Sequence, residues 1–208
     1  QRDGVYYTKD TNKPYSGEVF AIYEDGKNKA QGTLKDGNWN GLTTEFYENG
    51  QKMTEATFKD GKEDGLVTSW FENGKKKEER TYKDGKRNGL YTLWYDNGRK
   101  SEEGITKDGE KDKDGKKDGL WTEWYRNGKK RIEINYKDGK EDGLWINWYK
   151  NGFKEKQITW KDGKVVGLVT SWHKNGQKKE EGLVKDGYED GLWTSWYDNG
   201  QKKEEKTY

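Results

Sequence analysis

Apolar and polar residues alternate in short runs along this chain, and turn-forming dipeptides separate the runs. Residues 66–71 read Leu-Val-Thr-Ser-Trp-Phe, which is rich in the β-branched and aromatic residues that favour strands. Asn73 and Gly74 follow, and this dipeptide favours a two-residue type I′ hairpin turn. A second, highly charged run from Lys75 to Lys83 then completes a predicted β-hairpin.

The same pattern recurs from one end of the chain to the other. Asp25-Gly26 closes the first predicted hairpin, and seven Asn-Gly dipeptides close the later ones at a spacing of 24 residues, with one spacing of 30. Such a period is typical of repeat proteins, in which each unit packs on its neighbours. The sequence therefore predicts an all-β fold, a solenoid-like array of eight β-hairpins that form one elongated, twisted antiparallel sheet. The seven dipeptides begin at Asn49, Asn73, Asn97, Asn127, Asn151, Asn175 and Asn199.

Two segments depart from the period. Residues 1–16 contain the only proline, and we interpret them as an irregular N-terminal cap on a repeat array that spans residues 17–208. Six extra residues, near 108–113, lengthen one turn between hairpins. We expect this insertion to protrude as a longer loop.

The predicted turn at Asn73-Gly74 also sets the register of its hairpin. It pairs Trp70 with Lys77, so that these side chains share a face, and it places Gly65 opposite Tyr82. By alternation, one face carries Leu66, Thr68 and Trp70, and the other carries Val67, Ser69 and Phe71. Leu and Trp recur at the positions of Leu66 and Trp70 in later repeats, and we expect these two columns to form the core.

The other face carries a column of tyrosines and a more variable column that includes several tryptophans. Exposed aromatic side chains beside charged ones are typical of protein interfaces, so this face is the candidate binding surface. In an alternative interpretation, the rings pack against one another or against lysine stems in a single-layer sheet. The candidate binding residues are Tyr91, Trp121, Trp145, Trp193, Tyr95, Tyr125, Tyr149 and Tyr197.

The composition alone would indicate disorder, with 38% charged residues and a mean hydropathy of −1.51. The net charge of only +2 and the 14% of aromatic residues, all placed in phase with the repeat, favour a folded protein instead. The chain has no cysteine, which excludes disulfides, thiolate metal sites and thiol nucleophiles. No apolar run approaches the roughly 18 residues that a membrane span needs, so we expect no membrane insertion. The chain begins at Gln1, which favours a mature protein without its leader and a secreted or cell-envelope location over a cytoplasmic one.

The sequence predicts no catalytic residue, cofactor or metal, and therefore not an enzyme. The only histidine, His173, lies in a column of Tyr and Phe, and we interpret it as a substitution within that column. The acidic insertion from Glu110 resembles the opening of a calcium loop, but Trp121 falls where the bidentate Glu should lie. Nucleic-acid binding is also not expected, because 41 basic residues alternate with 39 acidic ones instead of forming a basic stripe.

Residues 190–203 read Asp-Gly-Leu-Trp-Thr-Ser-Trp-Tyr-Asp-Asn-Gly-Gln-Lys-Lys, and residues 82–86 read Tyr-Lys-Asp-Gly-Lys. This combination resembles the bacterial variant of the MORN repeat and is similar in particular to antitoxin components of the YwqK family, which pair with polymorphic toxins. The resemblance covers about residues 14 to 208, and the insertion at 108–113 departs from it. It implies a solenoid-like sheet of hairpins and a role in binding other proteins.

These observations favour a non-enzymatic repeat protein that binds a protein partner through an extended aromatic and charged sheet surface, with an antitoxin- or immunity-like role as one form. One alternative is an extracellular structural or self-associating repeat protein. Another is a carbohydrate-binding repeat protein, in which Trp and Tyr rings stack on sugars. The sequence does not distinguish these alternatives.

Overall fold

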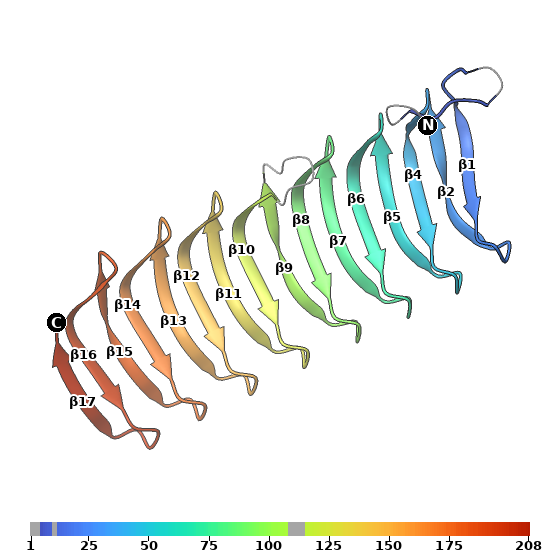
Figure 1. The fold of residues 1–208 in the computed structure, drawn as a ribbon. Coiled ribbons are helices and arrows are strands. Elements are labelled where there is room, and N and C mark those ends of the chain that lie inside the picture. Colours follow the sequence, from blue (N-terminus) through green and yellow to red (C-terminus); the bar gives the residue numbers. More distant parts are fainter. Residues whose placement is uncertain (1–4, 10–11, 108–114) are drawn as a thin grey trace. The chain divides into compact units, whose positions relative to one another are not determined.

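The computed structural model describes residues 5–9, 12–107 and 115–208. These residues form seventeen β-strands and no helix, and they therefore contain no helix long and apolar enough to cross a membrane. Neighbouring strands pair antiparallel as a succession of hairpins (Figure 1). The predicted fold class, an all-β array of hairpins in an antiparallel sheet, is confirmed.

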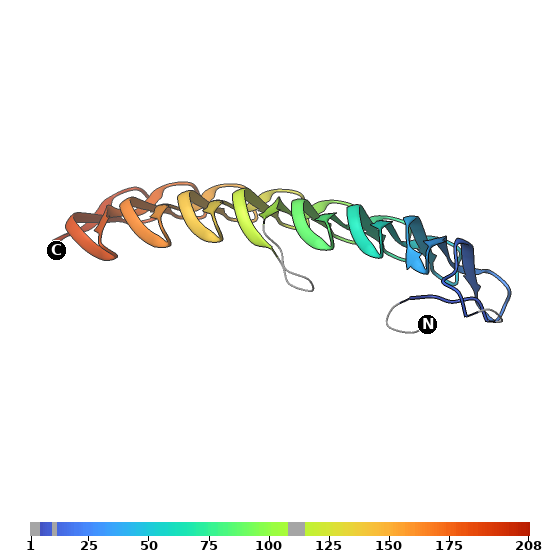
Figure 2. The same ribbon diagram turned by 90° about the horizontal axis from the view of Figure 1, so that it is seen from above.

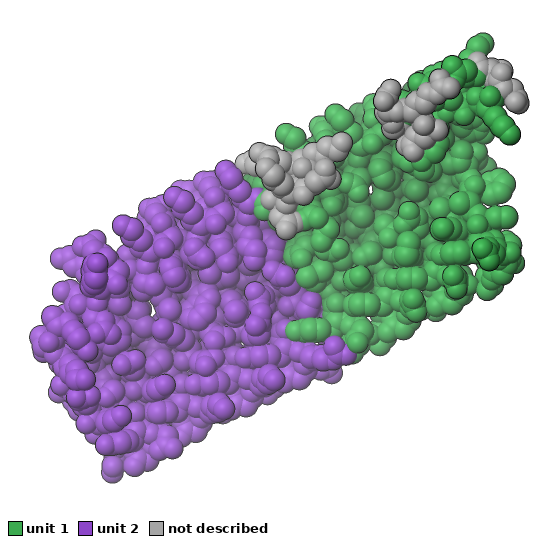
Figure 3. All heavy atoms as spheres, in the orientation of Figure 1, with its two compact units in different colours: residues 1–98, 106–115 green, residues 99–105, 116–208 purple. Residues whose placement is uncertain are grey.

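The chain divides into two compact units, which Figure 3 distinguishes by colour. Unit 1 comprises residues 1–98 and 106–115, and unit 2 comprises residues 99–105 and 116–208. Among the described residues, the strands of each unit lie in one layer that no second layer covers (Figure 2). The strands of unit 1 are β1 (Gly17–Ile22), β2 (Asn28–Lys35), β3 (Asn38–Trp39), β4 (Gly41–Phe46), β5 (Lys52–Lys59), β6 (Lys62–Trp70), β7 (Lys76–Lys83) and β8 (Lys86–Trp94). The strands of unit 2 are β9 (Lys100–Lys107), whose last two residues belong to unit 1, β10 (Lys116–Trp124), β11 (Lys130–Lys137), β12 (Lys140–Trp148), β13 (Lys154–Lys161), β14 (Lys164–Trp172), β15 (Lys178–Lys185), β16 (Tyr188–Trp196) and β17 (Lys202–Thr207).

The hairpin turns differ in type from the predicted one. Between β6 and β7, the Phe71 amide donates to the Lys75 carbonyl at 2.9 Å, and the Gly74 amide donates to the Phe71 carbonyl at 2.9 Å. The loop therefore has three residues and ends on Gly74, whose φ of 77° is the left-handed conformation required there. A type I′ turn needs positive φ at both central residues. Asn73 does not have it, so the prediction of a two-residue turn is wrong.

A β-bulge next to the turn restores the predicted register. Trp70 pairs with Lys76 instead of Lys77, and the register then shifts so that Gly65 lies opposite Tyr82, as predicted. A three-residue loop followed by one extra residue gives the rest of the hairpin the same register as a two-residue loop. Most of the predicted pairing is therefore confirmed, although the turn is of a different type.

The same bulge exchanges the faces of two lysines. Lys76 Nζ lies 5.7 Å from the ring centroid of Trp94, and Lys77 Nζ lies 5.9 Å from that of Phe71. The prediction that Lys77 shares the face of Trp70 is wrong, because the extra residue shifts the alternation of side chains at this point.

Type I′ turns occur instead at the Asp-Gly connections between hairpins. Asp84 and Gly85 have φ of 50° and 76°, and Lys83 pairs with Lys86 across them. Both central residues thus adopt the positive φ that a two-residue loop demands, which Asp and Gly tolerate. The aspartates with this conformation are Asp36, Asp60, Asp84, Asp138, Asp162 and Asp186.

We name the two faces of the sheet after the residues that they carry. The leucine face carries Leu66, Thr68, Trp70 and their equivalents in other repeats, and the tyrosine face carries Val67, Ser69, Phe71 and their equivalents, the last of which are mostly Tyr.

The leucine column is exposed, contrary to the prediction that it forms the core. Leu66 is 47% exposed, whereas Thr68, two residues further on, is 6% exposed. Thr68 faces the longer Glu79, which covers it, whereas Leu66 faces Thr81. The tryptophans of the Trp70 column are half-buried. The buried threonines at the Thr68 position are Thr44, Thr68, Thr92, Thr122 and Thr170.

The apolar cluster of unit 2 lies on the tyrosine face. Ile158, Val169 and Trp193 form it, and Trp145 and Trp160 pack against it. Both faces therefore carry aromatic side chains, but the tyrosine face of unit 2 holds its core.

Two glycines allow tryptophan rings to lie directly on the sheet. A Cβ on Gly182 would overlap the ring carbons of Trp193, and a Cβ on Gly104 would overlap those of Trp121. The indole nitrogen of Trp193 donates to the Leu183 carbonyl at 3.0 Å. As a result, Trp193 is only 9% exposed and Trp121 only 3%.

The described residues before β1 contact the first hairpins. Tyr7 forms a β-bridge with Pro14, and the Tyr6 amide donates to the Gly37 carbonyl at 2.8 Å. The ring of Tyr6 meets Trp39 edge-on at a centroid distance of 5.6 Å. The insertion at 108–113, including the acidic residues that resemble a calcium loop, lies outside the described residues.

Candidate binding surfaces

The hydroxyl groups of the tyrosine column join successive repeats. Tyr149 Oη donates to the Trp172 carbonyl at 2.8 Å, and Tyr125 makes the equivalent bond at 2.7 Å. Burial raises the pKa of both hydroxyls. Nε2 of His173 lies 3.0 Å from the Trp196 carbonyl oxygen, so the histidine takes the place of a tyrosine, as predicted.

The asparagines of the hairpin turns join each turn to the next. Asn127 Oδ1 accepts from the Lys129 amide at 3.0 Å, and its Nδ2 donates to the Lys150 carbonyl of the next repeat at 3.1 Å. This edge of the sheet is thus occupied by bonds between repeats, and the two faces are the stronger candidates for binding. The same pair of bonds recurs at Asn49, Asn73, Asn151 and Asn175.

A ladder of lysine–glutamate pairs crosses the leucine face. Lys178 Nζ lies 2.7 Å from Glu181 Oε2 and 5.7 Å from the ring centroid of Trp196 in the next repeat. The hydrogen bond from Lys178 lowers the pKa of Glu181. The bulge makes this pair possible, because it brings residues three apart onto one face. The equivalent pairs are Lys52–Glu55, Lys76–Glu79, Lys100–Glu103, Lys130–Glu133 and Lys202–Glu205.

A second row of ion pairs lies near the Asp-Gly turns of the same face. Asp142 Oδ2 is 3.1 Å from Lys161 Nζ, and Asp64 Oδ2 is 3.2 Å from Lys83 Nζ. The hydrogen bond from the lysine lowers the pKa of each aspartate. Both rows therefore hold positive and negative groups in pairs.

In each unit an apolar stripe runs between these two rows, and we call it the leucine stripe. It has one leucine per repeat, with exposed fractions from 40% at Leu144 to 55% at Leu192. In unit 2, Ile105 and Leu183 widen it, with exposed fractions of 42% and 47%. The leucines of the stripe are Leu42, Leu66, Leu90, Leu120, Leu144, Leu168 and Leu192.

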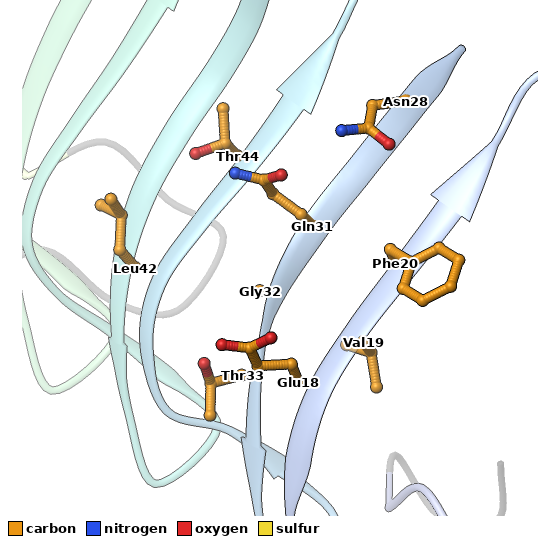
Figure 4. Close-up of a pocket in the computed structure, with 9 residues that line it drawn as sticks. All are labelled: Glu18, Val19, Phe20, Asn28, Gln31, Gly32, Thr33, Leu42 and Thr44. Atoms are coloured by element: carbon orange, nitrogen blue, oxygen red, sulfur yellow. The ribbon is translucent and has the colours of Figure 1, made fainter.

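A hollow of about 500 Å³ opens on the leucine face of unit 1, among β1, β2 and β4 (Figure 4). Asn28 and Gln31 line it, at the positions that hold Lys and Glu of the ladder in later repeats. Asn28 is too short to extend over the sheet as those lysines do. Phe20, which is 76% exposed, and Leu42 also border the hollow. The hollow therefore lies in a repeat where both the lysine and the glutamate of the ladder are replaced.

A smaller hollow, of about 260 Å³, lies on the tyrosine face of unit 2. Trp145 and Tyr149 provide its aromatic lining, and Asn147 Nδ2 donates to Glu155 Oε2 at 2.6 Å beside them. Ser171 lines the hollow, and its small side chain helps to leave this space. The equivalent position holds Ser69 and Ser195 in two repeats and the larger Leu93, Glu123 and Asn147 in others. The other lining residues are Lys156, Trp172, Lys179 and Glu180. We call this site the serine hollow.

Comparison with protein families identifies the repeat. The family described as MORN repeat variant matches residues 39–60, 63–84, 117–138, 165–186 and 189–208, which together cover just over half of the chain. The chain belongs to the MORN repeat variant family. Each matched segment of this MORN repeat variant protein contains one hairpin, such as β6–β7 in residues 63–84. No curated protein matches the chain. The bacterial origin and the similarity to YwqK-family antitoxins stay expectations.

The structure places the predicted binding residues of this MORN repeat variant in different environments. Trp121 and Trp193 are buried, so the exposure on which their prediction depended is absent. Tyr197 is 50% exposed. The half-buried members are Tyr91, Tyr95, Tyr125, Trp145 and Tyr149. Only Trp145 and Tyr149 come together at the serine hollow. Their role in binding stays a prediction.

Sequence reasoning missed the leucine stripe because it assigned leucine to the core. Most of the leucines have a polar residue opposite them, such as Thr81 opposite Leu66 and Asn135 opposite Leu120, and this is the signal that could have revealed the stripe. Among the described residues, no group of three or more His, Cys, Asp or Glu side chains is arranged to hold a metal ion.

Proposed function

We propose that this MORN repeat variant protein is a non-enzymatic binding module whose tyrosine face, in unit 2, contacts a protein partner. The serine hollow is the observation that carries the proposal. It combines the half-buried aromatic rings of Trp145 and Tyr149 with a space of about 260 Å³. Binding energy at protein interfaces is concentrated where a side chain of one partner fills such a pocket on the other.

The charged groups around the hollow support a protein partner with both acidic and basic groups. Lys156 and Lys179 line the site together with Glu155 and Glu180. Complementary charges at an interface contribute mainly to the choice of partner and to the rate of association. An antitoxin- or immunity-like role would be a specific form of this function, and it depends on the resemblance of the repeat alone.

The proposal can be tested by filling the hollow. Ser171→Leu should retain the fold, because Leu93 occupies the equivalent position in another repeat, and Ser171→Ala keeps the space open as a matched control. The immobilised full chain and both variants are exposed to lysate and medium of the source cells. We expect the parent and the alanine variant to retain the same discrete protein, and the leucine variant to lose it.

Two results would contradict this proposal. Retention of the same protein by Ser171→Leu would move the binding surface away from the hollow. Slower migration of the parent, but not of Ser171→Leu, in a gel that contains a polysaccharide would make the site a sugar-binding one.

A Ser171→Lys variant adds a charge at the rim of the same space. Like Ser171→Leu, it should no longer retain the partner protein.

A further inference from the structure

The leucine stripe is broadest in unit 2. Leu168 lies opposite Leu183, so two apolar side chains that are 51% and 47% exposed are neighbours there. Val166 is on the same face and is half-buried. Leu144 and Leu192 continue the stripe in the adjacent repeats. In a chain with 27% hydrophobic residues, this is a concentration of exposed apolar surface.

The charges beside this surface are neutralised within the protein. Lys178 pairs with Glu181 on one side of the stripe, and Asp142 pairs with Lys161 on the other. A partner that covers the leucines therefore meets rows of paired charges, and the electrostatic potential beside the stripe has no excess of either sign. The whole chain has a net charge of only +2, so two copies repel each other weakly.

We propose that the occupant of the leucine stripe in unit 2 is the same stripe of a second copy of this chain. The two faces pack about 10 Å apart, with the leucines of one copy between those of the other. The contact is isologous, because the same surface is used by both copies. It is independent of partner binding at the serine hollow, which lies on the opposite face.

Two properties of the stripe favour a second copy over an unrelated partner. The leucines recur once per two strands, which corresponds to about 9.6 Å from the usual distance between strands. A second copy carries the same interval and can therefore match every leucine at once. The paired charges avoid repulsion between identical faces. The stripe of unit 2 offers about six apolar side chains, fewer than the ~20–30 residues per side of a standard interface, so the dimer is weak and dissociates on dilution.

The test is sedimentation equilibrium of the full chain from about 5 to about 500 μM, a range that spans weak association. The double variant Leu144→Ser/Leu168→Ser should raise the dissociation constant of the dimer at least about tenfold. Phe153→Lys is the matched control, because Phe153 is 51% exposed, like Leu168, but lies on the edge formed by the hairpin turns. We expect it to leave association unchanged.

A variant that adds to the stripe keeps the test decisive if the serine variants unfold. Thr159 is exposed and lies opposite Leu144, at the position that Leu183 has opposite Leu168. Thr159→Leu should therefore lower the dissociation constant several-fold. Added salt should not weaken the dimer, because burial of apolar surface stabilises it.

Several outcomes would overturn the proposal. One is that the parent and the Thr159→Leu variant both stay monomeric at the highest concentration. Another is equal weakening by Phe153→Lys and by the double variant, which would point to association along the turn edge. A dimer that is unaffected by all stripe variants, or that dissociates in salt, would require a different surface.

Discussion

Replacing Gly182 by alanine should destabilise unit 2, although alanine is the better residue in a strand. The new Cβ would overlap the ring carbons of Trp193, which is 9% exposed and lies directly on this glycine. Overpacking of this kind costs about 1–3 kcal/mol. Displacement of the ring also weakens the hydrogen bond from its indole nitrogen to the Leu183 carbonyl, a further ~1 kcal/mol.

The favourable part of the change is smaller than these costs. A strand residue gains about 0.5–1 kcal/mol when glycine becomes alanine, since the unfolded chain loses less entropy. The net expectation is a destabilisation of about 2 kcal/mol. Ala56 has the equivalent position in another repeat, where its two cross-strand partners, Thr43 and Val67, have no ring. The cost thus arises from the ring of Trp193 and not from the alanine itself.

A double-mutant cycle with Trp193→Val separates these effects. Without the indole ring only the gain of about 0.5–1 kcal/mol remains, so Gly182→Ala should slightly stabilise the protein and the coupling between the two positions should be about 3 kcal/mol. The assay is urea unfolding followed by far-ultraviolet circular dichroism, with an unchanged slope required for the comparison. Additive effects within ~0.5 kcal/mol, or a Gly182→Ala variant as stable as the parent, would refute the reasoning.

Three further predictions concern the bonds between and within repeats. Tyr149→Phe should destabilise the protein by about 1 kcal/mol, because the carbonyl it serves loses its donor; Tyr197→Phe, at a 50% exposed ring, should change the urea midpoint much less. Asn127→Ala removes two hydrogen bonds at a hairpin turn, so the backbone amides of that turn should exchange their hydrogens faster than in the parent. The turn of an Asn199→Ala variant serves as the comparison. The pKa of Glu181 is lowered in the folded state, so its contribution to stability is present above the unfolded pKa and is lost as the pH falls through the folded pKa. The difference in urea midpoint between parent and Glu181→Gln should accordingly shrink from pH 6 towards about pH 3.

The fold could be predicted from the sequence because the repeat period is a strong signal. Asn-Gly and Asp-Gly dipeptides alternate along the chain and mark both kinds of connection, so the hairpins follow without knowledge of the exact turn types. The structure has three-residue loops at Asn-Gly, where a type I′ turn was expected, and type I′ turns at Asp-Gly. The predicted register of the hairpin is retained because the bulge at Trp70 offsets the longer loop.

The faces of individual side chains near the turns could not be predicted in the same way. One extra residue in the strand moves Lys76 to the leucine face and allows it to pair with Glu79. A bulge depends on local backbone geometry, and the alternation of polar residues in the sequence does not mark it. The ladder of ion pairs on the leucine face was therefore not foreseen.

Burial was the least predictable property, because a single-layer sheet has no second layer to define an inside. Exposure depends instead on what lies opposite in the neighbouring strands. Trp121 is buried because Gly104 lets its ring approach the backbone, whereas Leu66, opposite Thr81, stays 47% exposed. Hydrophobicity taken residue by residue gives the opposite assignment for this pair, with leucine inside and the variable tryptophan outside.

The same dependence connects the packing to the proposed binding surfaces. Short side chains leave room at both proposed sites. The small Ser171 leaves space in the serine hollow next to Trp145, and Thr159 lies beside Leu144 on the other face, where Leu183 lies beside Leu168. Changing these short residues should therefore alter binding with little effect on the fold, whereas changing their large neighbours alters both. Ser171→Leu and Thr159→Leu test this in opposite directions, since the first fills a site and the second enlarges one.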